Sequence, residues 1–382
     1  MKKINVIHII PNLKSGGAER LTLDICTYLA NHHEFNLKLL LIYNEIEFTP
    51  PKNVDLQILK EKGNLSIFKK NNHNEHEINL ILEEFKPDII HTHLFEAELI
   101  GRYKRIKNCV YISHIHDNIK QFDTNLNLFK KSNLTNLYEK KWIYKSYKLI
   151  NNKFIVISKD SNDYCKKHLP RKLKKNIHFL PNAIDYKKFY QDISNDKRTD
   201  VLKIISVGSL VEKKNHMFLI DIAKEFIERG VNIQINIFGG GPIFQKLESS
   251  IKENKLEEIV KLNGKNSTIE TEFKKSDYYI HPATYEPFGL VLLEAMASGL
   301  PVISLNGKGN KDIIKHGENG YIFDNQDAVE FVDTILKLEQ DENLRMKILQ
   351  NGHKTAWRYD IDSYMKKLIH LYKKSIIEKN NN

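Results

Sequence analysis

Residues 278–305, YYIHPATYEPFGLVLLEAMASGLPVISL, contain a complete strand–helix–strand unit. The apolar run at 278–282 predicts a strand, the pattern at 289–298 predicts a helix, and PVISL at 301–305 predicts a second strand. Both strands are too apolar to expose one polar face, which is typical of parallel sheets covered by helices on both sides. This stretch therefore indicates an α/β fold.

The same alternation runs through the rest of the chain. Further strands are expected at 3–10, 36–43, 88–93, 109–116, 153–158, 177–180, 202–208, 232–239 and 259–264, and helices at 18–31, 75–86, 216–229 and 242–253. At roughly 100–200 residues per domain, a chain of 382 residues predicts two domains.

The polar stretch 186–200 has no apolar periodicity and is the expected boundary between the domains. We therefore expect doubly wound domains over 1–190 and 191–360. Helical spacing over 356–378 predicts a C-terminal helix, which we assign to 361–382 with a frayed tail. Packing of this helix back onto the amino-terminal domain is one arrangement open to it.

Cysteine content and hydropathy indicate the compartment. The three cysteines, Cys26, Cys109 and Cys165, are far apart and lack CxxC spacing, so neither a disulfide framework nor a thiolate zinc site is expected. The apolar run in residues 1–10 is too short for a signal peptide, and no window of about 18 apolar residues occurs elsewhere. These features predict a soluble or peripheral protein of the reducing cytoplasm.

The net charge of +11 is unevenly distributed. Residues 101–175 contain 19 Lys and Arg against five Asp and Glu. Such a region favours an anionic partner, namely nucleic acid, a phospholipid surface or a phosphate-bearing substrate, and the alternative is a solvated lysine-rich surface. Within it, 129–150 combines lysines with apolar residues at helical spacing, which favours an anionic membrane surface, the alternative being a stripe that packs in the core: Leu134, Leu137, Tyr138, Trp142 and Leu149.

Three glycine turns follow predicted strands and lead into helices. They are Gly16-Gly17, the loop 208–216 that includes Lys214, and Gly239-Gly240-Gly241 before Pro242. Glycine lets the backbone approach a ligand closely, and the amino end of the following helix favours an anion such as phosphate. Each turn alone could be purely structural. Three of them at carboxyl ends of strands favour a ligand site, because open α/β sheets bind ligands at that edge.

Two glutamates flank the start of the helix in the opening stretch. Glu286 comes just before the expected start near Gly289, and Glu294 falls in its second turn. Carboxylates accept hydrogen bonds from hydroxyl pairs, and amino-terminal helix amides donate to phosphate. The pair therefore suits a polyhydroxylated phosphate ester. The alternative, a capping Glu286 and a solvated Glu294, is less consistent with the apolar run around Glu294.

At this point the sequence resembles the retaining glycosyltransferases of family 4. The matching segments are 15–20 (SGGAER), 181–185 (PNAID), 214–216 (KNH), 317–321 (GENGY) and the E-x7-E pattern at 286–294. The resemblance implies a GT-B fold, in which two doubly wound Rossmann-like domains face each other across a cleft. It also implies transfer of a sugar from a nucleotide sugar without a metal.

Residue roles follow from the resemblance alone. Glu294 would hold the ribose hydroxyls, and Glu286 would contact hydroxyls of the transferred sugar. Backbone amides near the helix start would face the sugar or the phosphate: Phe288, Gly289 and Leu290. Gly16-Gly17 would cover the diphosphate, and Gly240-Gly241 would line the nucleotide pocket.

The resemblance also implies the catalytic set of Glu286, His116 and Lys214, with Lys214 neutralising the diphosphate and His116 directed at the donor sugar. Ser209 is a departure, since the family usually carries Arg there, and it stays among the nucleotide-sugar-binding positions. Lys213 or Arg20 could supply the missing cation. A core histidine is the alternative for His116.

The sequence therefore predicts a retaining glycosyltransferase that takes a UDP- or GDP-sugar, with no cofactor and no metal site. The only D-x-D sequence, Asp360-Ile361-Asp362, is expected within the C-terminal helix. A saccharide or lipid-linked acceptor would give a role in surface polysaccharide or glycan assembly, at the inner face of the cytoplasmic membrane. The rivals are a nicotinamide-dependent oxidoreductase, which would need the spaced glycine fingerprint, and a nucleic-acid-binding protein, for which charge alone speaks.

Overall fold

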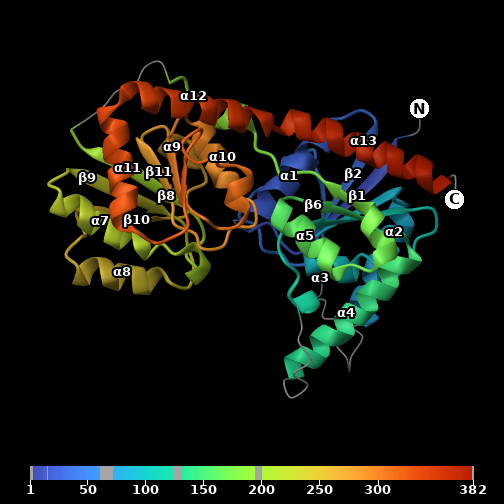
Figure 1. Ribbon diagram of the computed structural model, residues 1–382. Coiled ribbons are helices and arrows are strands. Elements are labelled where there is room, and N and C mark those ends of the chain that lie inside the picture. The colour runs from blue at the N-terminus through green and yellow to red at the C-terminus, as the bar shows by residue number, and fades with distance from the viewer. Residues whose placement is uncertain (1–2, 15, 61–71, 124–130, 194–199, 381–382) are drawn as a thin grey trace. The chain divides into compact units, whose positions relative to one another are not determined.

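The computed structural model describes residues 3–14, 16–60, 72–123, 131–193 and 200–380 (Figure 1). The chain divides into two compact units. The amino-terminal unit comprises Met1–Pro181 and Tyr364–Asn382, and the carboxy-terminal unit comprises Asn182–Ser363. The sequence predicts a boundary at 190/191, and the short helix α6 (Tyr186–Phe189) lies just before it.

The described part of the amino-terminal unit forms a seven-stranded parallel sheet in the order β3-β2-β1-β4-β5-β6-β7. Its strands are β1 (Ile4–Ile10), β2 (Phe35–Leu41), β3 (Asp55–Ile58), β4 (Ile89–His93), β5 (Val110–Ile115), β6 (Lys153–Val156) and β7 (Ile177–Phe179). Its helices are α1 (Gly17–Ala30), α2 (Asn72–Phe85), α3 (Phe95–Ile100), α4 (Lys131–Leu149), α5 (Lys159–His168) and most of α13 (Ile361–Asn380), with 3₁₀ turns at Lys120–Asp123 and Arg171–Asn176.

Alternation along the strands sends side chains to two differently packed faces. Ile7 and Ile9 of β1 and Ile90 of β4 pack with apolar residues of α2 and α3. His8 and His91, which neighbour these isoleucines along the strands, lie on the opposite face. Tyr372 of α13 contacts both histidines there. The C-terminal helix therefore completes the core of the first unit.

The described part of the carboxy-terminal unit forms a six-stranded parallel sheet in the order β10-β9-β8-β11-β12-β13. Its strands are β8 (Leu202–Val207), β9 (Ile233–Phe238), β10 (Val260–Gly264), β11 (Tyr278–His281), β12 (Val302–Leu305) and β13 (Tyr321–Phe323). Besides α6, its helices are α7 (Phe218–Glu228), α8 (Phe244–Glu253), α9 (Ile269–Phe273), α10 (Leu290–Ala297), α11 (Ala328–Gln340) and α12 (Glu342–Arg358), with 3₁₀ turns at Glu212–Lys214 and Gly309–Asp312.

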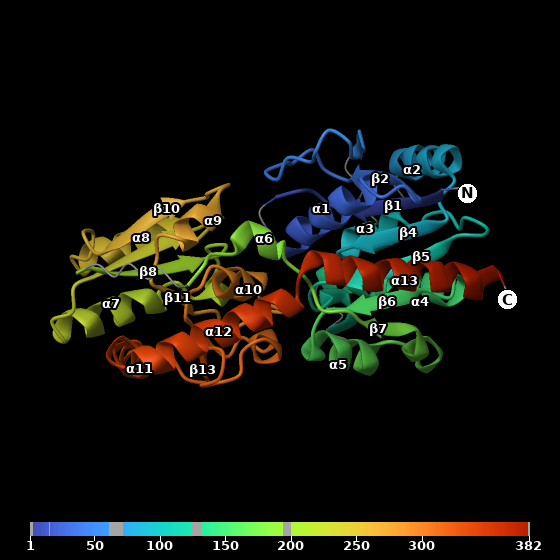
Figure 2. The same ribbon diagram turned by 90° about the horizontal axis from the view of Figure 1, so that it is seen from above.

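One buried cluster joins the strands of this sheet to α7, α8 and α11, while α10 packs against β11, β12 and α12 (Figure 2). In both sheets the order reverses next to the first strand of the unit, which is the doubly wound Rossmann-like arrangement. The predicted α/β fold with two such sheets is therefore confirmed.

The C-terminal helix assigned to 361–382 is found as α13, Ile361–Asn380, whereas the helical spacing that begins at 356 also covers the end of α12. The chain turns between α12 and α13, where the Asp360 carboxylate accepts hydrogen bonds from the amides of Tyr186 (3.3 Å) and Asp362 (3.1 Å). An acidic residue that binds the free amides of a new helix start is a typical cap. Asp360 therefore lies before α13 and not within a helix as expected.

Candidate functional site

The predicted donor-binding residues of the second unit gather at the carboxyl edge of its sheet. The strand order reverses between β8 and β11, so the loops after these strands lie next to each other. Hydrogen bonds tie the loops together, among them one from the Asn215 side chain to the Pro282 carbonyl (3.1 Å) and one from the Thr284 amide to the Lys213 carbonyl (3.0 Å). The edge at which open α/β sheets bind ligands is thus built as a rigid unit.

Glycines permit the turns at this edge to pack backbone against backbone. A Cβ atom on Gly239 would lie 1.8 Å from the Gly208 carbonyl oxygen, and one on Gly241 would lie 2.3 Å from that of Leu210. Gly240 is less restricted, because its Cβ would meet the flexible Lys265 side chain at 3.0 Å. Gly239 and Gly241 therefore have a structural reason for being glycine, whatever ligand they face.

A three-residue polar cluster occupies the centre of the edge. Lys214, in the 3₁₀ turn after β8, forms an ion pair with Glu286. His281, at the end of β11, places Nε2 3.2 Å from the same carboxylate oxygen, and its Nδ1 is 2.9 Å from the Tyr279 hydroxyl. The structure therefore brings two of the predicted catalytic residues into direct contact, together with a histidine that the sequence analysis did not select.

The backbone of Glu286 is held in place from both sides. Its amide donates to the Gly307 carbonyl (2.7 Å), and its carbonyl accepts from the Gly309 amide (3.0 Å). The side chain is only 11% exposed. Burial alone would raise the pKa of this carboxyl, but the Lys214 ammonium and His281 outweigh burial and lower the pKa to about 2. Glu286 is therefore a buried, fixed carboxylate at neutral pH.

Glu294 lies in the second turn of α10, as predicted, and is half-buried. Burial first, and then the charges of Glu286 and Glu294, raise the pKa of Tyr279 well above its usual range, so both carboxylates lie near this hydroxyl. Helix α10 begins after Gly289, whose φ of +98° suits glycine. The first amides of the helix have no carbonyl within it to bind and can donate to a ligand.

The other predicted positions in this region differ in exposure. Ser209 is exposed beside the glycine turns, and the side chains of Phe288 and Leu290 are buried, so these two can offer only backbone groups. Phe288 packs edge-on against Tyr359 with ring centroids 5.8 Å apart. This contact anchors the segment between Glu286 and the helix.

In the amino-terminal unit, Gly16 is the residue before α1 and Gly17 is the first residue of the helix, which agrees with the predicted strand-to-helix turn. Ser15 lies outside the described residues. Arg20 in the first turn pairs with Asp24 at 3.2 Å and lies over the Phe48 ring. This guanidinium is therefore already engaged in the unliganded chain.

His116 follows the end of β5 and is buried. Its Nε2 lies 2.9 Å from Nδ1 of His93, while its Nδ1 has no hydrogen-bond partner among the described residues. Burial lowers the pKa of His116 to about 3, so the imidazole is neutral at pH 7.

The basic region 101–175 lies partly outside the described residues, at 124–130. Arg102 is not available to an external anion, because it forms a buried ion pair with Glu98 at 3.0 Å. On α4, Ile143 and Tyr147 face the core. By helical spacing the predicted apolar stripe falls on another face of α4 than these two residues, and Leu134 and Leu149 are 39% and 55% exposed. Exposed lysines share the helix surface with them: Lys141, Lys145 and Lys148.

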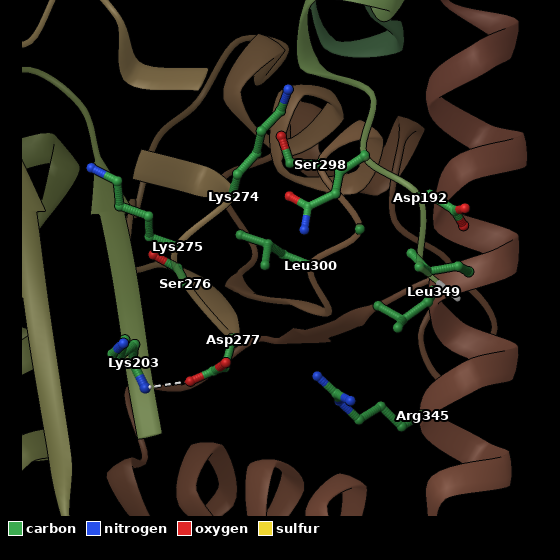
Figure 3. A pocket seen from close by; sticks show the side chains of 13 residues that line it. Asp192, Lys203, Lys274, Lys275, Ser276, Asp277, Ser298, Leu300, Arg345 and Leu349 are labelled. Carbon is green, nitrogen blue, oxygen red and sulfur yellow. Dashed lines mark hydrogen bonds between the residues drawn. The ribbon is translucent and has the colours of Figure 1, made fainter. Parts of the chain in front are cut away.

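Pockets in each unit are lined by residues other than the polar cluster of Lys214, His281 and Glu286. A pocket of about 320 Å³ in the second unit contains no predicted site residue (Figure 3). It lies at the opposite, amino edge of the sheet, where the Lys203 amide donates to Asp277 at 2.7 Å. A pocket of about 620 Å³ in the first unit lies where β1, β2 and β4 end and is lined by polar groups that include Asn12, Glu45 and Gln121.

No helix among the described residues combines the length and apolar character that crossing a bilayer requires.

Comparisons with known proteins find matches along most of the chain. A family model described as Glycosyltransferase Family 4 matches residues 15–188, and one described as Glycosyl transferases group 1 matches residues 187–355. The UDP-Gal:alpha-D-GlcNAc-diphosphoundecaprenol alpha-1,3-galactosyltransferase of Escherichia coli is 24% identical over 349 residues, which cover 87% of this chain and 84% of that protein. A poly(glycerol-phosphate) alpha-glucosyltransferase of Bacillus subtilis (strain 168) is 26% identical, over 49% of this chain and 28% of its own length.

Among solved structures, Anabaena HepE in complex with UDP and glucose has the same fold, with a TM-score of 0.77 at 18% identity. The match covers 96% of this chain and 99% of HepE. The two family models together match most of the chain, and they place it among the glycosyltransferases of the GT-B fold.

Proposed function

We propose that this chain transfers a glycosyl group from a nucleoside diphosphate sugar to a saccharide or lipid-linked acceptor, with retention of configuration. The observation that carries the proposal is the polar cluster at the carboxyl edge of the second sheet, where Lys214, His281 and Glu286 meet beside the start of α10. A fixed carboxylate, a cation and free helix amides match the hydroxyls and phosphates of such a donor.

The chemistry requires stabilisation of a leaving group. As the acceptor oxygen bonds to the anomeric carbon, the bond to the diphosphate breaks and negative charge builds on the phosphate oxygens. In the unliganded chain Lys214 pairs with Glu286, so donor binding would turn the ammonium toward the diphosphate and leave the Glu286 carboxylate to accept hydrogen bonds from sugar hydroxyls. The departing phosphate takes the acceptor proton, and no side chain is assigned as the base.

The remaining roles are proposed with the same logic. Glu294 holds the ribose hydroxyls, Gly16-Gly17 and Gly240-Gly241 approach the diphosphate and nucleotide, and His116 contacts the transferred sugar. Ser209 provides no charge, so Lys214 provides most of the positive charge at the diphosphate.

The relatives suggest the classes of substrate. The Escherichia coli relative is named for a UDP-sugar donor and a diphosphoundecaprenol-linked acceptor, and HepE binds UDP and glucose. We therefore propose a UDP- or GDP-sugar donor and a role in surface polysaccharide or glycan assembly. The comparisons do not favour a nicotinamide-dependent oxidoreductase or a nucleic-acid-binding protein.

We further propose that the enzyme works in the cytoplasm at the inner face of the membrane, with α4 against anionic lipid. The exposed Leu134 and Leu149 beside exposed lysines support this orientation. Vesicle binding that is indifferent to anionic lipid content would refute it.

The test is a donor screen that measures release of free nucleoside diphosphate with and without candidate acceptors. We expect turnover with one nucleotide sugar class, unchanged by EDTA, and an α-linked donor should give an α-linked product by NMR of the anomeric proton. Stimulation by NAD(P) alone, or an inverted product, would contradict the proposal.

A further inference from the structure

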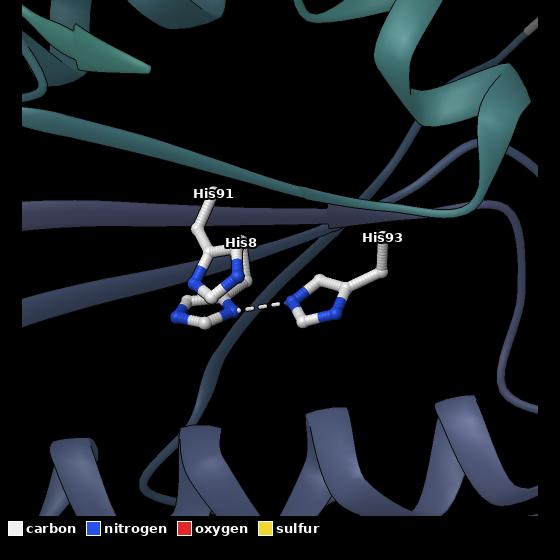
Figure 4. A group of neighbouring side chains, drawn as sticks. All are labelled: His8, His91 and His93. Carbon is white, nitrogen blue, oxygen red and sulfur yellow. Dashed lines mark hydrogen bonds between the residues drawn. The ribbon is translucent and has the colours of Figure 1, made fainter. Parts of the chain in front are cut away.

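Five histidines converge on one face of the amino-terminal sheet. His8 of β1 pairs in register with His91 of β4, and His93 pairs with His114 of β5. Together with His116, these side chains are buried on one face of three neighbouring strands, β1, β4 and β5. Figure 4 shows His8, His91 and His93, with a hydrogen bond joining His8 to His93. None of these residues except His116 has a role in the proposed function.

Four of the imidazoles and one hydroxyl form a continuous chain of hydrogen bonds. The Tyr372 hydroxyl lies 2.6 Å from Nδ1 of His91 and 3.2 Å from Nε2 of His8. Nδ1 of His8 lies 2.8 Å from Nε2 of His93, and Nδ1 of His93 lies 2.9 Å from Nε2 of His116. The C-terminal helix is thereby linked to His116 through two intervening histidines.

A shared metal ion would require different spacing. Ring nitrogens of each of two groups, His8-His91-His93 and His93-His114-His116, lie within 4.8 Å of one another. Two nitrogens bound tetrahedrally to one zinc at 2.0–2.1 Å would be about 3.3 Å apart. The 2.8 and 2.9 Å contacts within the chain are shorter than this and suit N–H···N hydrogen bonds.

Proton counting links the tautomers of these residues. Burial lowers the pKa of His8, His91, His93 and His116, so each imidazole is neutral and has one N–H and one acceptor nitrogen. Three arrangements give every contact one donor. All four histidines carry the proton on Nε2, or all carry it on Nδ1, or His91 alone carries it on Nδ1 and the Tyr372 oxygen accepts from both His91 and His8.

The contact lengths distinguish these arrangements. A separation of 2.6 Å is short for an N–H donor but normal for an O–H donor, whereas 3.2 Å is normal for N–H···O. The Tyr372 hydroxyl therefore donates to His91, and Nε2–H of His8 donates to Tyr372. In this arrangement of tautomers, the Nε2–H group of His91 has no acceptor among the described residues, which is its energetic cost.

We infer that Tyr372, acting through His8 and His93, is a positioning residue that fixes His116 in the Nε2–H tautomer and leaves its Nδ1 as a hydrogen-bond acceptor. Nδ1 of His116 is buried and has no partner among the described residues, so it is an unsatisfied acceptor that a hydrogen bond from a ligand hydroxyl would satisfy. That this hydroxyl belongs to the donor sugar rests on the proposed function.

Tyr372→Phe tests this inference, because it keeps the aromatic ring and removes the hydroxyl that sets the direction of the hydrogen bonds from His8 to His116. Tyr364→Phe is the matched control, since Tyr364 is also buried on α13 and its hydroxyl has no partner among the described residues. Selective ¹⁵N-histidine labelling of the full chain distinguishes protonated from bare ring nitrogens. Single His→Gln replacements assign the signals.

We expect the four histidines of the wild-type chain to carry the proton on Nε2, Tyr372→Phe to give a mixture at His116, and Tyr364→Phe to change nothing. A proton on Nδ1 of any of the four in the wild type would overturn the inference. So would an unchanged His116 in Tyr372→Phe, or stoichiometric uptake of Zn²⁺ added alone with loss of the Nε2–H signals.

Kinetics provide the functional half of the test. Tyr372→Phe should lower kcat/KM for the nucleotide sugar by about two- to tenfold, the range for one hydrogen bond, and leave the Kd of the bare nucleoside diphosphate unchanged. If Tyr372→Phe weakened binding of the bare nucleoside diphosphate as much as it lowered kcat/KM for the nucleotide sugar, a role directed at the sugar would be contradicted. If the wild-type chain binds no nucleotide at all, the proposed function fails, whereas the tautomer result is decided independently by NMR.

Discussion

Replacing Lys214 with alanine should affect turnover and stability through the same ion pair. The substitution leaves the Glu286 carboxylate buried with His281 as its remaining partner in the polar cluster. Burial raises the pKa of Glu286, yet Lys214 and His281 bring it from 4.5 down to about 2. A fall of this size corresponds to about 3 kcal/mol of stabilisation of the charged form, and breaking a buried ion pair by removing one partner typically costs about 3–5 kcal/mol.

The loss of stability in Lys214→Ala should depend on pH in a defined direction. Because the folded-state pKa of Glu286 is depressed, its contribution to stability is fully present above about pH 4.5 and disappears as the pH falls toward 2. The difference in free energy of unfolding between wild type and Lys214→Ala should therefore be largest near neutral pH and shrink through this window. Urea titrations at several pH values measure it.

Turnover should fall by about 100- to 1,000-fold, the usual effect of removing one group that stabilises charge in the transition state. Lys246→Ala is the matched control, because this exposed lysine of the same unit pairs only at the surface with Glu212. The double variant Lys214→Ala/Glu286→Gln should recover stability without recovering turnover. A folded Lys214→Ala variant that retains most of its activity would refute the assignment of Lys214 to the diphosphate.

Three further perturbations test other parts of the structure. Gly241→Ala should weaken nucleotide binding and lower stability by about 1–3 kcal/mol, because its Cβ would lie 2.3 Å from the Leu210 carbonyl oxygen; an unchanged unfolding midpoint would show that the loop adapts. Arg102→Met should destabilise the amino-terminal unit by about 3–5 kcal/mol by leaving Glu98 buried without its cation, which chemical unfolding checks. Replacing three exposed lysines of α4 by glutamine should weaken flotation with anionic vesicles and leave binding to neutral vesicles unchanged: Lys141, Lys145 and Lys148.

Much of the fold could be predicted because most of its strands are apolar runs and three of them lead into glycine turns. Strand β8 was expected at 202–208 and is found at Leu202–Val207, and α10 was expected at 289–298 and is found at Leu290–Ala297. Strand β3 was missed because its four residues are polar or half-exposed and show no apolar run. Apolar spacing continues across the break before α13, so the spacing alone does not mark it; the side-chain cap of Asp360 does.

The sequence predicted the members of the site better than their partners. Glu286, Glu294 and Lys214 were selected by type and spacing, but spacing cannot show that Lys214 pairs with Glu286 before any ligand binds. His281 was missed because a histidine at the end of a buried strand has no distinguishing local pattern. Only the pairing of β11 with β8 brings it to the carboxylate.

The central claim is that the two glutamates around the start of α10 hold the hydroxyls of a nucleotide sugar. Calorimetric titration of wild type, Glu294→Gln and Glu286→Gln, each with the nucleoside diphosphate and with its sugar conjugate, tests it most directly. Glu294→Gln should weaken both ligands, because both contain the ribose, whereas Glu286→Gln should weaken only the conjugate. Binding of both ligands that survives both substitutions, or a wild-type chain that binds neither, would contradict the account.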